Sequence, residues 1–125
     1  MMRAFLLVGT LALMATLAAC SAREQQPAPG YVCTTQAVNS VVAHVNDALG
    51  APITSASVQY SVNNGAFAPA ESALNGLYGM AYETTGNFVV QVTVGAQPMQ
   101  AQSTTVSMDS VGCHVVTQEL FFTFQ

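Results

Sequence analysis

The sequence predicts an all-β fold for residues 31–125, an antiparallel two-sheet β-sandwich of about seven strands. Two observations lead to this fold class. Apolar and polar residues alternate with a period of two in several short runs, and clusters of turn-forming residues separate those runs. No segment after the N-terminal apolar run shows the period of an amphipathic helix. A closed barrel is the alternative arrangement for so many short strands.

The strands are predicted from side chains that would share one face. Alternation is clearest where serine, glutamine and threonine separate apolar residues. The run Ser103 to Met108 is polar, which predicts a strand at the edge of a sheet. The predicted inward-facing residues are Val41, Ala43 and Val45, then Ala56, Val58, Tyr60 and Val62, then Phe88, Val90, Val92 and Val94, and finally Leu120, Phe122 and Phe124. Tyr78, Met80 and Tyr82 indicate a weaker middle strand.

Turns are predicted at three places between these runs. Asn64-Gly65 indicates a two-residue type I′ hairpin that would place Val62 opposite Phe67. The segment 47–52 contains Gly50-Ala51-Pro52 and breaks the chain after the first strand, and 84–87 is a third turn.

Residues 1–19 are predicted to be a secretory signal peptide, with Arg3 near its start and an apolar run of about fourteen residues. That run is too short for a transmembrane helix of about twenty residues. Leu17-Ala18-Ala19-Cys20 resembles the lipobox of bacterial lipoprotein precursors. The resemblance implies cleavage before Cys20 and di- or tri-acylation of that residue, which anchors a protein stably in a membrane. An ordinary signal cleavage with Cys20 incidental is the alternative.

Residues 20–30 are predicted to be a lipidated cysteine and a flexible tether, because the segment is polar and contains two prolines and a glycine. Ten such residues span at most about 30 Å, which keeps the domain close to the membrane. The residue after Cys20 is Ser21 rather than aspartate. In a Gram-negative source, the lipoprotein resemblance then implies the outer membrane, on its periplasmic face.

Cys33 and Cys113 remain once Cys20 is assigned to lipid, and in an oxidising compartment they are predicted to form a disulfide. Such a bridge would close a loop of about eighty residues, which the chain-entropy model credits with roughly 4–5 kcal/mol. A free, catalytic or metal-binding cysteine is the alternative, and it would need a base or a cation beside the thiol.

The charge balance excludes some partner classes. The chain has two basic residues, Arg3 and Arg23, against six acidic residues, and no lysine. A surface almost without cations does not neutralise phosphates, which argues against nucleic acid as a partner. It also lacks the basic patch that binds anionic lipid head groups. Membrane attachment is therefore expected to come from the lipid at Cys20 or from a partner.

Two long stretches, residues 45–65 and 76–94, resemble the bacterial carboxypeptidase regulatory-like domains. The resemblance implies a transthyretin-type (prealbumin-like), immunoglobulin-like β-sandwich that serves as an accessory, binding or spacing module and not as a catalyst. The matching residues are Val45, Asp47, Gly50, Pro52, Ile53, Ala56 and Val58, followed by Gly86, Phe88, Val90 and Val92.

No arrangement in the sequence predicts catalysis, a metal or a cofactor. His44 and His114 lack the spacing of a metal-binding pair, and the methionines after the signal peptide are scattered. The chain contains no GxSxG or SxxK motif. We therefore expect no enzyme, no metal and no cofactor, although a pocket joining either histidine to carboxylates would favour metal binding or catalysis.

The sequence-based functional hypothesis is a non-enzymatic cell-envelope lipoprotein, a structural or assembly accessory that acts through protein contacts. The alternative is a carbohydrate- or peptide-binding module that uses exposed aromatic residues and strand edges. Tyr78 and Phe121 are the candidate ligand-binding residues for that alternative. Packing of both aromatic side chains in the core or at a sheet edge remains the competing interpretation.

Overall fold

The computed structural model describes residues 30–125, so the predicted signal peptide, Cys20 and the tether up to residue 29 lie outside the described residues. The described chain folds into strands without a helix, and hence without a helix that could cross a membrane. Its strands are β1 (Asn39–Asp47), β2 (Ser57–Val62), β3 (Ala68–Pro69), β4 (Glu71–Ser72), β5 (Leu77–Tyr82), β6 (Gly86–Thr93), β7 (Gln100–Val106) and β8 (Gln118–Phe124).

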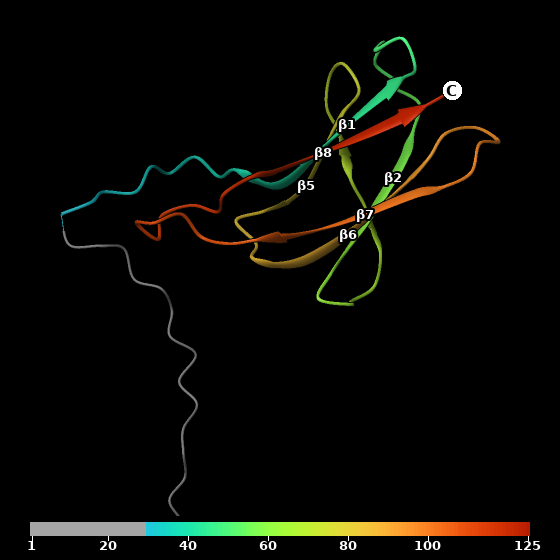
Figure 1. The fold of residues 1–125 in the computed structure, drawn as a ribbon. Helices are drawn as coiled ribbons and strands as arrows, with labels where there is room; N and C mark the ends of the chain where they lie inside the picture. The colour runs from blue at the N-terminus through green and yellow to red at the C-terminus, as the bar shows by residue number, and fades with distance from the viewer. Residues whose placement is uncertain (1–29) are drawn as a thin grey trace, which may run out of the picture.

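The strands form two four-stranded sheets that face each other (Figure 1). Sheet A has the order β4-β5-β1-β8, and sheet B has the order β3-β2-β6-β7. The predicted all-β two-sheet sandwich is confirmed. The pairings are antiparallel except for β1 with β8, which run parallel with Val41 opposite Gln118. The parallel pair was not predicted, because alternation does not encode strand direction.

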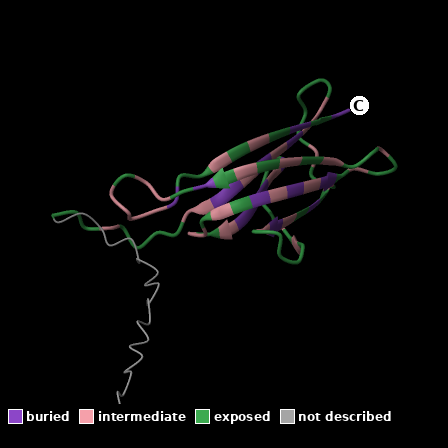
Figure 2. Ribbon diagram, turned by 60° about the horizontal axis from the view of Figure 1, so that its bottom comes forward, coloured by how far each residue is buried: buried purple, intermediate pink, exposed green. Residues whose placement is uncertain are grey.

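The core lies between the sheets (Figure 2). It contains the predicted inward-facing residues, some of them only partly buried, together with Tyr78, Met80, Val106 and Val115, which were not predicted to face inward. In β1, Val41, Ala43 and Val45 are fully buried, whereas His44 faces the other side of the sheet. The remaining buried apolar residues are Val58, Tyr78, Met80, Phe88, Val90, Val92, Val106, Val115, Phe122 and Phe124. Burying such side chains stabilises the fold by roughly 1.5–3 kcal/mol each before the entropic cost of ordering them.

The turn after β2 differs from the predicted Asn64-Gly65 hairpin by one residue. Asn63 and Asn64 both have positive φ angles, and the Gly65 N–H donates to the carbonyl of Val62 at 2.9 Å. Positive φ at both central positions defines a type I′ turn, and asparagine tolerates it. Asn63 is further fixed because its Oδ1 accepts the N–H of Asn87 at 2.9 Å, which ties the turn to the start of β6.

The expected pairing of Val62 with Phe67 is consequently wrong. In the β2–β3 ladder, Tyr60 pairs with Ala68, so Phe67 precedes β3 and remains 45% exposed. The turn predicted at 47–52 is confirmed: Asp47 Oδ1 accepts the N–H groups of Leu49 and Ala51 at 2.9 and 2.8 Å.

Glutamine side chains close the side of the sandwich where β7 and β8, the edge strands of the two sheets, lie. The amides of Gln102, Gln100 and Gln97 donate to the carbonyls of Phe121, Thr123 and Gln125 at 2.7, 2.7 and 2.9 Å. Gln97 also accepts the N–H of Gln125 at 3.0 Å. These carbonyls lie along the edge of β8 that is not paired with β1, so side-chain amides take the place of a neighbouring strand.

Replacing both Gln100 and Gln102 with alanine is therefore expected to lower the free energy of unfolding by about 1–2 kcal/mol and to promote pairing of β8 edges between molecules. Denaturant unfolding and light scattering on residues 21–125, exported without the lipobox, measure both effects. Gln59→Ala is the matched control, because Gln59 is exposed in β2 and caps no carbonyl among the described residues. A double variant that is as stable and as monomeric as this control would contradict the capping role.

Candidate functional site

The predicted disulfide is present and joins the segment before β1 to the loop before β8. Cys33 and Cys113 are 80 residues apart in sequence, and their Cα atoms lie 5.2 Å apart. Because β1 and β8 are neighbours in sheet A, the bridge closes the end of this strand pair. We call this end, formed by residues 30–38, the loop 107–117 and Glu83, the bridged pole (Figure 1).

Glu83 receives three hydrogen bonds from two chain segments of the bridged pole. Its Oε1 accepts the N–H of Val38 at 3.0 Å and lies 2.6 Å from Nδ1 of His114, while its Oε2 accepts the N–H of Val115 at 3.1 Å. Partial burial alone would raise the pKa of Glu83, but the hydrogen bonds from His114, Val38 and Val115 outweigh it and lower the pKa below its ordinary value. Glu83 is therefore a carboxylate at neutral pH.

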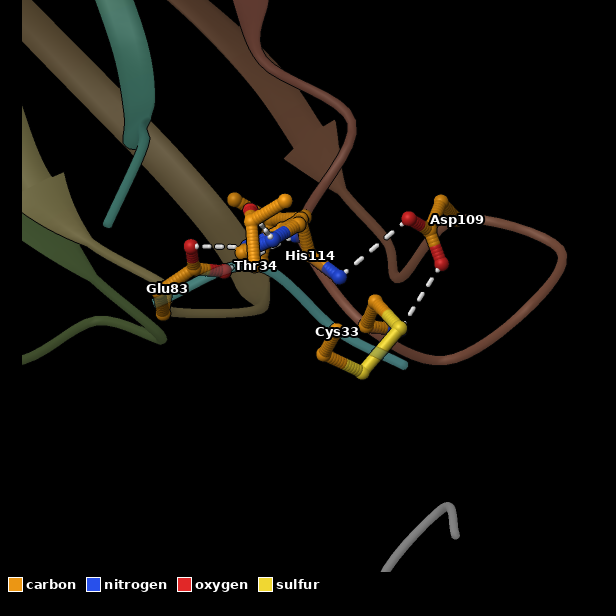
Figure 3. The surroundings of a disulfide bond; sticks show 7 residues. Cys33, Thr34, Glu83, Asp109 and His114 are labelled. Carbon is orange, nitrogen blue, oxygen red and sulfur yellow. Dashed lines mark hydrogen bonds and ion pairs between the residues drawn. A yellow bond between two sulfur atoms is a disulfide. The ribbon is translucent and has the colours of Figure 1, made fainter. Parts of the chain in front are cut away.

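An ionised Glu83 fixes the tautomer of His114. A carboxylate only accepts hydrogen bonds, so Nδ1 of His114 carries the proton, and in the neutral ring Nε2 is left as an acceptor. Nε2 lies 2.8 Å from the hydroxyl oxygen of Thr34, whose O–H then donates to it. Figure 3 shows Thr34, His114 and Glu83 beside the disulfide. They form a continuous hydroxyl–imidazole–carboxylate chain.

Asp109 holds the backbone that presents His114. Its carboxylate accepts the N–H of Cys113 at 2.9 Å and the N–H of His114 at 3.2 Å (Figure 3). Burial works to raise the pKa of Asp109, but backbone hydrogen bonds, those of Cys113 and His114 first, prevail and lower it. The loop 109–114 is thus fixed by a charged acceptor as well as by the disulfide.

The hydroxyl–imidazole–carboxylate chain borders a shallow depression of about 220 Å³. The depression is lined by residues 34–37 together with Glu83, Cys113 and His114. Sequence reasoning missed this arrangement, because it weighed His114 only as a metal ligand and did not single out Glu83. A signal was available, because Thr34 and His114 each follow one cysteine of the predicted disulfide. The position of Glu83 was not deducible, since it depends on how the chain passes from β5 in sheet A to β6 in sheet B.

Tyr78 is not a surface residue, and the expectation that it binds ligand is wrong. It is 2% exposed, and its hydroxyl donates to the carbonyl of Ile53 at 2.9 Å and accepts the N–H of Ala56 at 3.1 Å. The ring fills the core, and the hydroxyl fixes the segment before β2. The polar end of a tyrosine needs a partner when buried, and here the backbone supplies it.

Phe121, the other candidate, is 59% exposed on β8 and stacks on His44 of β1, with ring centroids 4.5 Å apart. Nε2 of His44 lies 3.6 Å from Oε1 of Glu119, and both residues belong to the outer face of sheet A. Over residues 30–125, no three histidine, cysteine or acidic residues form a group able to hold a metal ion. The structure therefore separates Tyr78 from Phe121 and leaves Phe121 as an exposed aromatic on a rigid strand.

The end of the sandwich opposite the bridged pole, which we call the distal pole, consists of the loops 47–53, 73–76 and 94–99 and the C-terminal Gln125 (Figure 1). Gly76 of the second loop lies against β1, because the N–H of Val45 donates to its carbonyl at 2.9 Å, and it also lies against Pro52 of the first loop. A Cβ atom at Gly76 would lie 2.9 Å from Cβ of Pro52, so this close approach requires glycine.

Large apolar side chains project from the turns of the distal pole. Leu49 is 95% exposed and Leu74 is 83% exposed, and Met99 follows with 53%. The carboxylate of Asp47 accepts hydrogen bonds from the turn that carries Leu49. The turn that carries Leu74 is closed by a hydrogen bond from the N–H of Ala73 to the carbonyl of Leu77 at 2.8 Å. These side chains contribute little to the core, while hydrogen bonds fix the backbone of the turns that carry Leu49 and Leu74.

Comparison with known proteins leaves the family open. No family model matches the chain, no curated protein matches it, and no solved structure matches it. The resemblances to lipoprotein precursors and to carboxypeptidase regulatory-like domains therefore stay predictions.

Glu83→Gln is expected to lower the melting temperature at pH 7 by about 4–8 °C, because an amide replaces the charged acceptor shared by three donors. The pKa of Glu83 is lower in the folded protein than its ordinary 4.5. Its stabilisation is therefore complete above pH 4.5 and disappears as the pH falls through the folded-state value. Thermal melts from pH 7 to pH 3 should show the two proteins converging in acid.

Glu119→Gln is the matched control for this prediction. Glu119 is an exposed carboxylate on β8, and its Oε1 lies 3.6 Å from Nε2 of His44. Such a pair contributes little, so this variant should melt like the wild type. An equal effect of the two substitutions, or a Glu83→Gln deficit that does not shrink as the pH is lowered from 7 to 3, would contradict the role given to Glu83.

Proposed function

We propose that this protein is a non-enzymatic cell-envelope lipoprotein, anchored through Cys20 in the outer membrane, that acts as a structural or assembly accessory. Its partner is a protein that binds the distal pole. The observation that carries the proposal is the pair of almost fully exposed leucines, Leu49 and Leu74, on fixed turns of that pole. The described chain begins at the bridged pole, at the opposite end of the sandwich. A membrane tether at Cys20 would therefore leave the distal pole free to meet a partner.

The turns of the distal pole are ordered before a partner binds. An apolar side chain that is exposed in the monomer gains free energy when a partner removes it from water, at about 25 cal/mol per Å². Binding normally costs conformational entropy for each loop and side chain that becomes ordered. The hydrogen bonds from Leu49 and Ala51 to Asp47 order one turn in advance. Two exposed leucines on ordered turns of the same pole are therefore suited to act as anchor residues in a protein interface.

The second candidate function is a carbohydrate- or peptide-binding module, and Phe121 is the observation that favours it. The ring is 59% exposed, and its stacking on His44 holds it on the outer face of sheet A. An aromatic face presented in this way can stack on a sugar ring. Glu119 lies on the same face and offers a carboxylate to sugar hydroxyls.

Photo-crosslinking in cells separates the two candidates. A photoreactive phenylalanine analogue at Leu49 or Leu74 should give a discrete protein adduct, whereas the same analogue at Thr105, exposed in β7 of sheet B, should not. Leu49→Ser/Leu74→Ser should abolish complex formation and change the free energy of unfolding by less than about 1 kcal/mol, since both residues are exposed.

The proposal fails if Leu49, Leu74 and Thr105 give the same adducts, or if the double serine variant keeps its partner. Phe121→Ser is the parallel test of the alternative. Loss of binding to envelope polysaccharide in this variant alone, with the distal-pole variant unaffected, would establish the carbohydrate- or peptide-binding function in place of the accessory function.

A further inference from the structure

We propose that Thr34 is a reactive hydroxyl that accepts an acyl group from a small, uncharged ester, with His114 as its general base. This modification site lies at the bridged pole and is independent of the protein contact proposed for the distal pole. The inference rests on the order of groups Thr34–His114–Glu83, in which each polar atom is within hydrogen-bond distance of the next.

The arrangement meets the geometric requirements of an activated nucleophile. The hydroxyl oxygen of Thr34 lies 2.8 Å from Nε2 of His114, and Nδ1 of the same ring lies 2.6 Å from Oε1 of Glu83. A nucleophile, a base and a group that orients the base are thus arranged in sequence. Glu83 stabilises the imidazolium that forms when His114 takes a proton.

The surrounding protein keeps His114 in this position. Cys113, the residue before His114, is fixed by the disulfide, and the N–H of His114 donates to the carboxylate of Asp109 at 3.2 Å. Thr34 directly follows Cys33, the other half of the bridge. The disulfide therefore brings the hydroxyl of Thr34 close to the imidazole of His114, in addition to the hydrogen bond between the two side chains (Figure 3).

The depression beside Thr34 indicates the class of acyl donor. Its volume of about 220 Å³ suits a small acyl group, and Gln36 in its lining carries an amide of the type that stabilises an oxyanion. Glu83 also lines the depression, and both basic residues of the chain precede residue 30, so residues 30–125 offer no lysine or arginine to bind an anion. The site consequently favours a neutral ester over a carboxylate or phosphate ester.

The step is balanced without another reactant. The Thr34 oxygen forms a bond to the ester carbonyl carbon, and its proton passes to Nε2 of His114. The bond between that carbon and the alcohol oxygen then breaks, and the departing alcohol takes the proton from His114. The products are acyl-Thr34 and the free alcohol, and no group is oxidised or reduced.

The test uses p-nitrophenyl acetate with the protein purified from cells that express the full chain. We expect a burst of p-nitrophenol of up to one equivalent, together with a mass increase of one acetyl group that peptide mapping assigns to Thr34. The chain contains no lysine, which removes the usual side-chain amine background. Thr34→Val should abolish the burst, and Thr34→Ser should restore it, because a serine hydroxyl can occupy the same position.

His114→Gln should slow acylation by at least about tenfold, since a positioned general base typically contributes roughly 10²–10⁴-fold. Thr105→Val is the matched control; that hydroxyl donates to Asn87 Oδ1, and its loss should leave the burst unchanged. A burst that persists in Thr34→Val, acetyl groups on other residues only, or the absence of a burst in a protein with an intact disulfide would each overturn the proposal. None of these results bears on crosslinking at Leu49, so the two proposals fail separately.

Discussion

A single carboxylate, Glu83, joins the chain segments that meet at the bridged pole. It accepts hydrogen bonds from the segment entering β1, through Val38, and from the segment leading to β8, through His114 and Val115. The Cys33–Cys113 disulfide supports the same junction covalently. Because β1 lies between β5 and β8 in sheet A, this junction holds one end of the central strand pair together. The tautomer of His114 and the hydrogen bond of Thr34 also follow from the charge of Glu83.

The two ends of the sandwich differ in chemistry because they differ in how the chain is held. At the bridged pole, the disulfide, Glu83 and Asp109 fix polar groups in place. At the distal pole, backbone turns present apolar side chains to solvent. The glutamine side chains along β8 protect an otherwise open edge between these ends. Burial of apolar residues between the sheets supplies the stability that allows both ends to carry exposed features.

Local pattern predicted the sheets well, because alternation reports which face of a strand is buried. The inward residues of β1, β6 and β8 are those expected, and the cysteine count predicted the disulfide correctly. The errors arose where a polar atom finds its partner far away in sequence. Tyr78 is buried because Ile53 and Ala56 satisfy its hydroxyl, and the turn after β2 shifts because Asn63 binds Asn87. The relation of Glu83 to His114 likewise depends on the path between the sheets, which composition and spacing do not contain.

We propose that a lipid at Cys20 tethers the bridged pole of a disulfide-closed sandwich. The intact mass of the mature protein, measured under non-reducing conditions from the detergent phase of a membrane extract, tests this arrangement. The expected species is a chain that starts at Cys20, carries acyl groups and has two hydrogens fewer than the reduced form. A soluble product that lacks acyl groups and has free thiols at Cys33 and Cys113 would contradict both the anchor and the bridge.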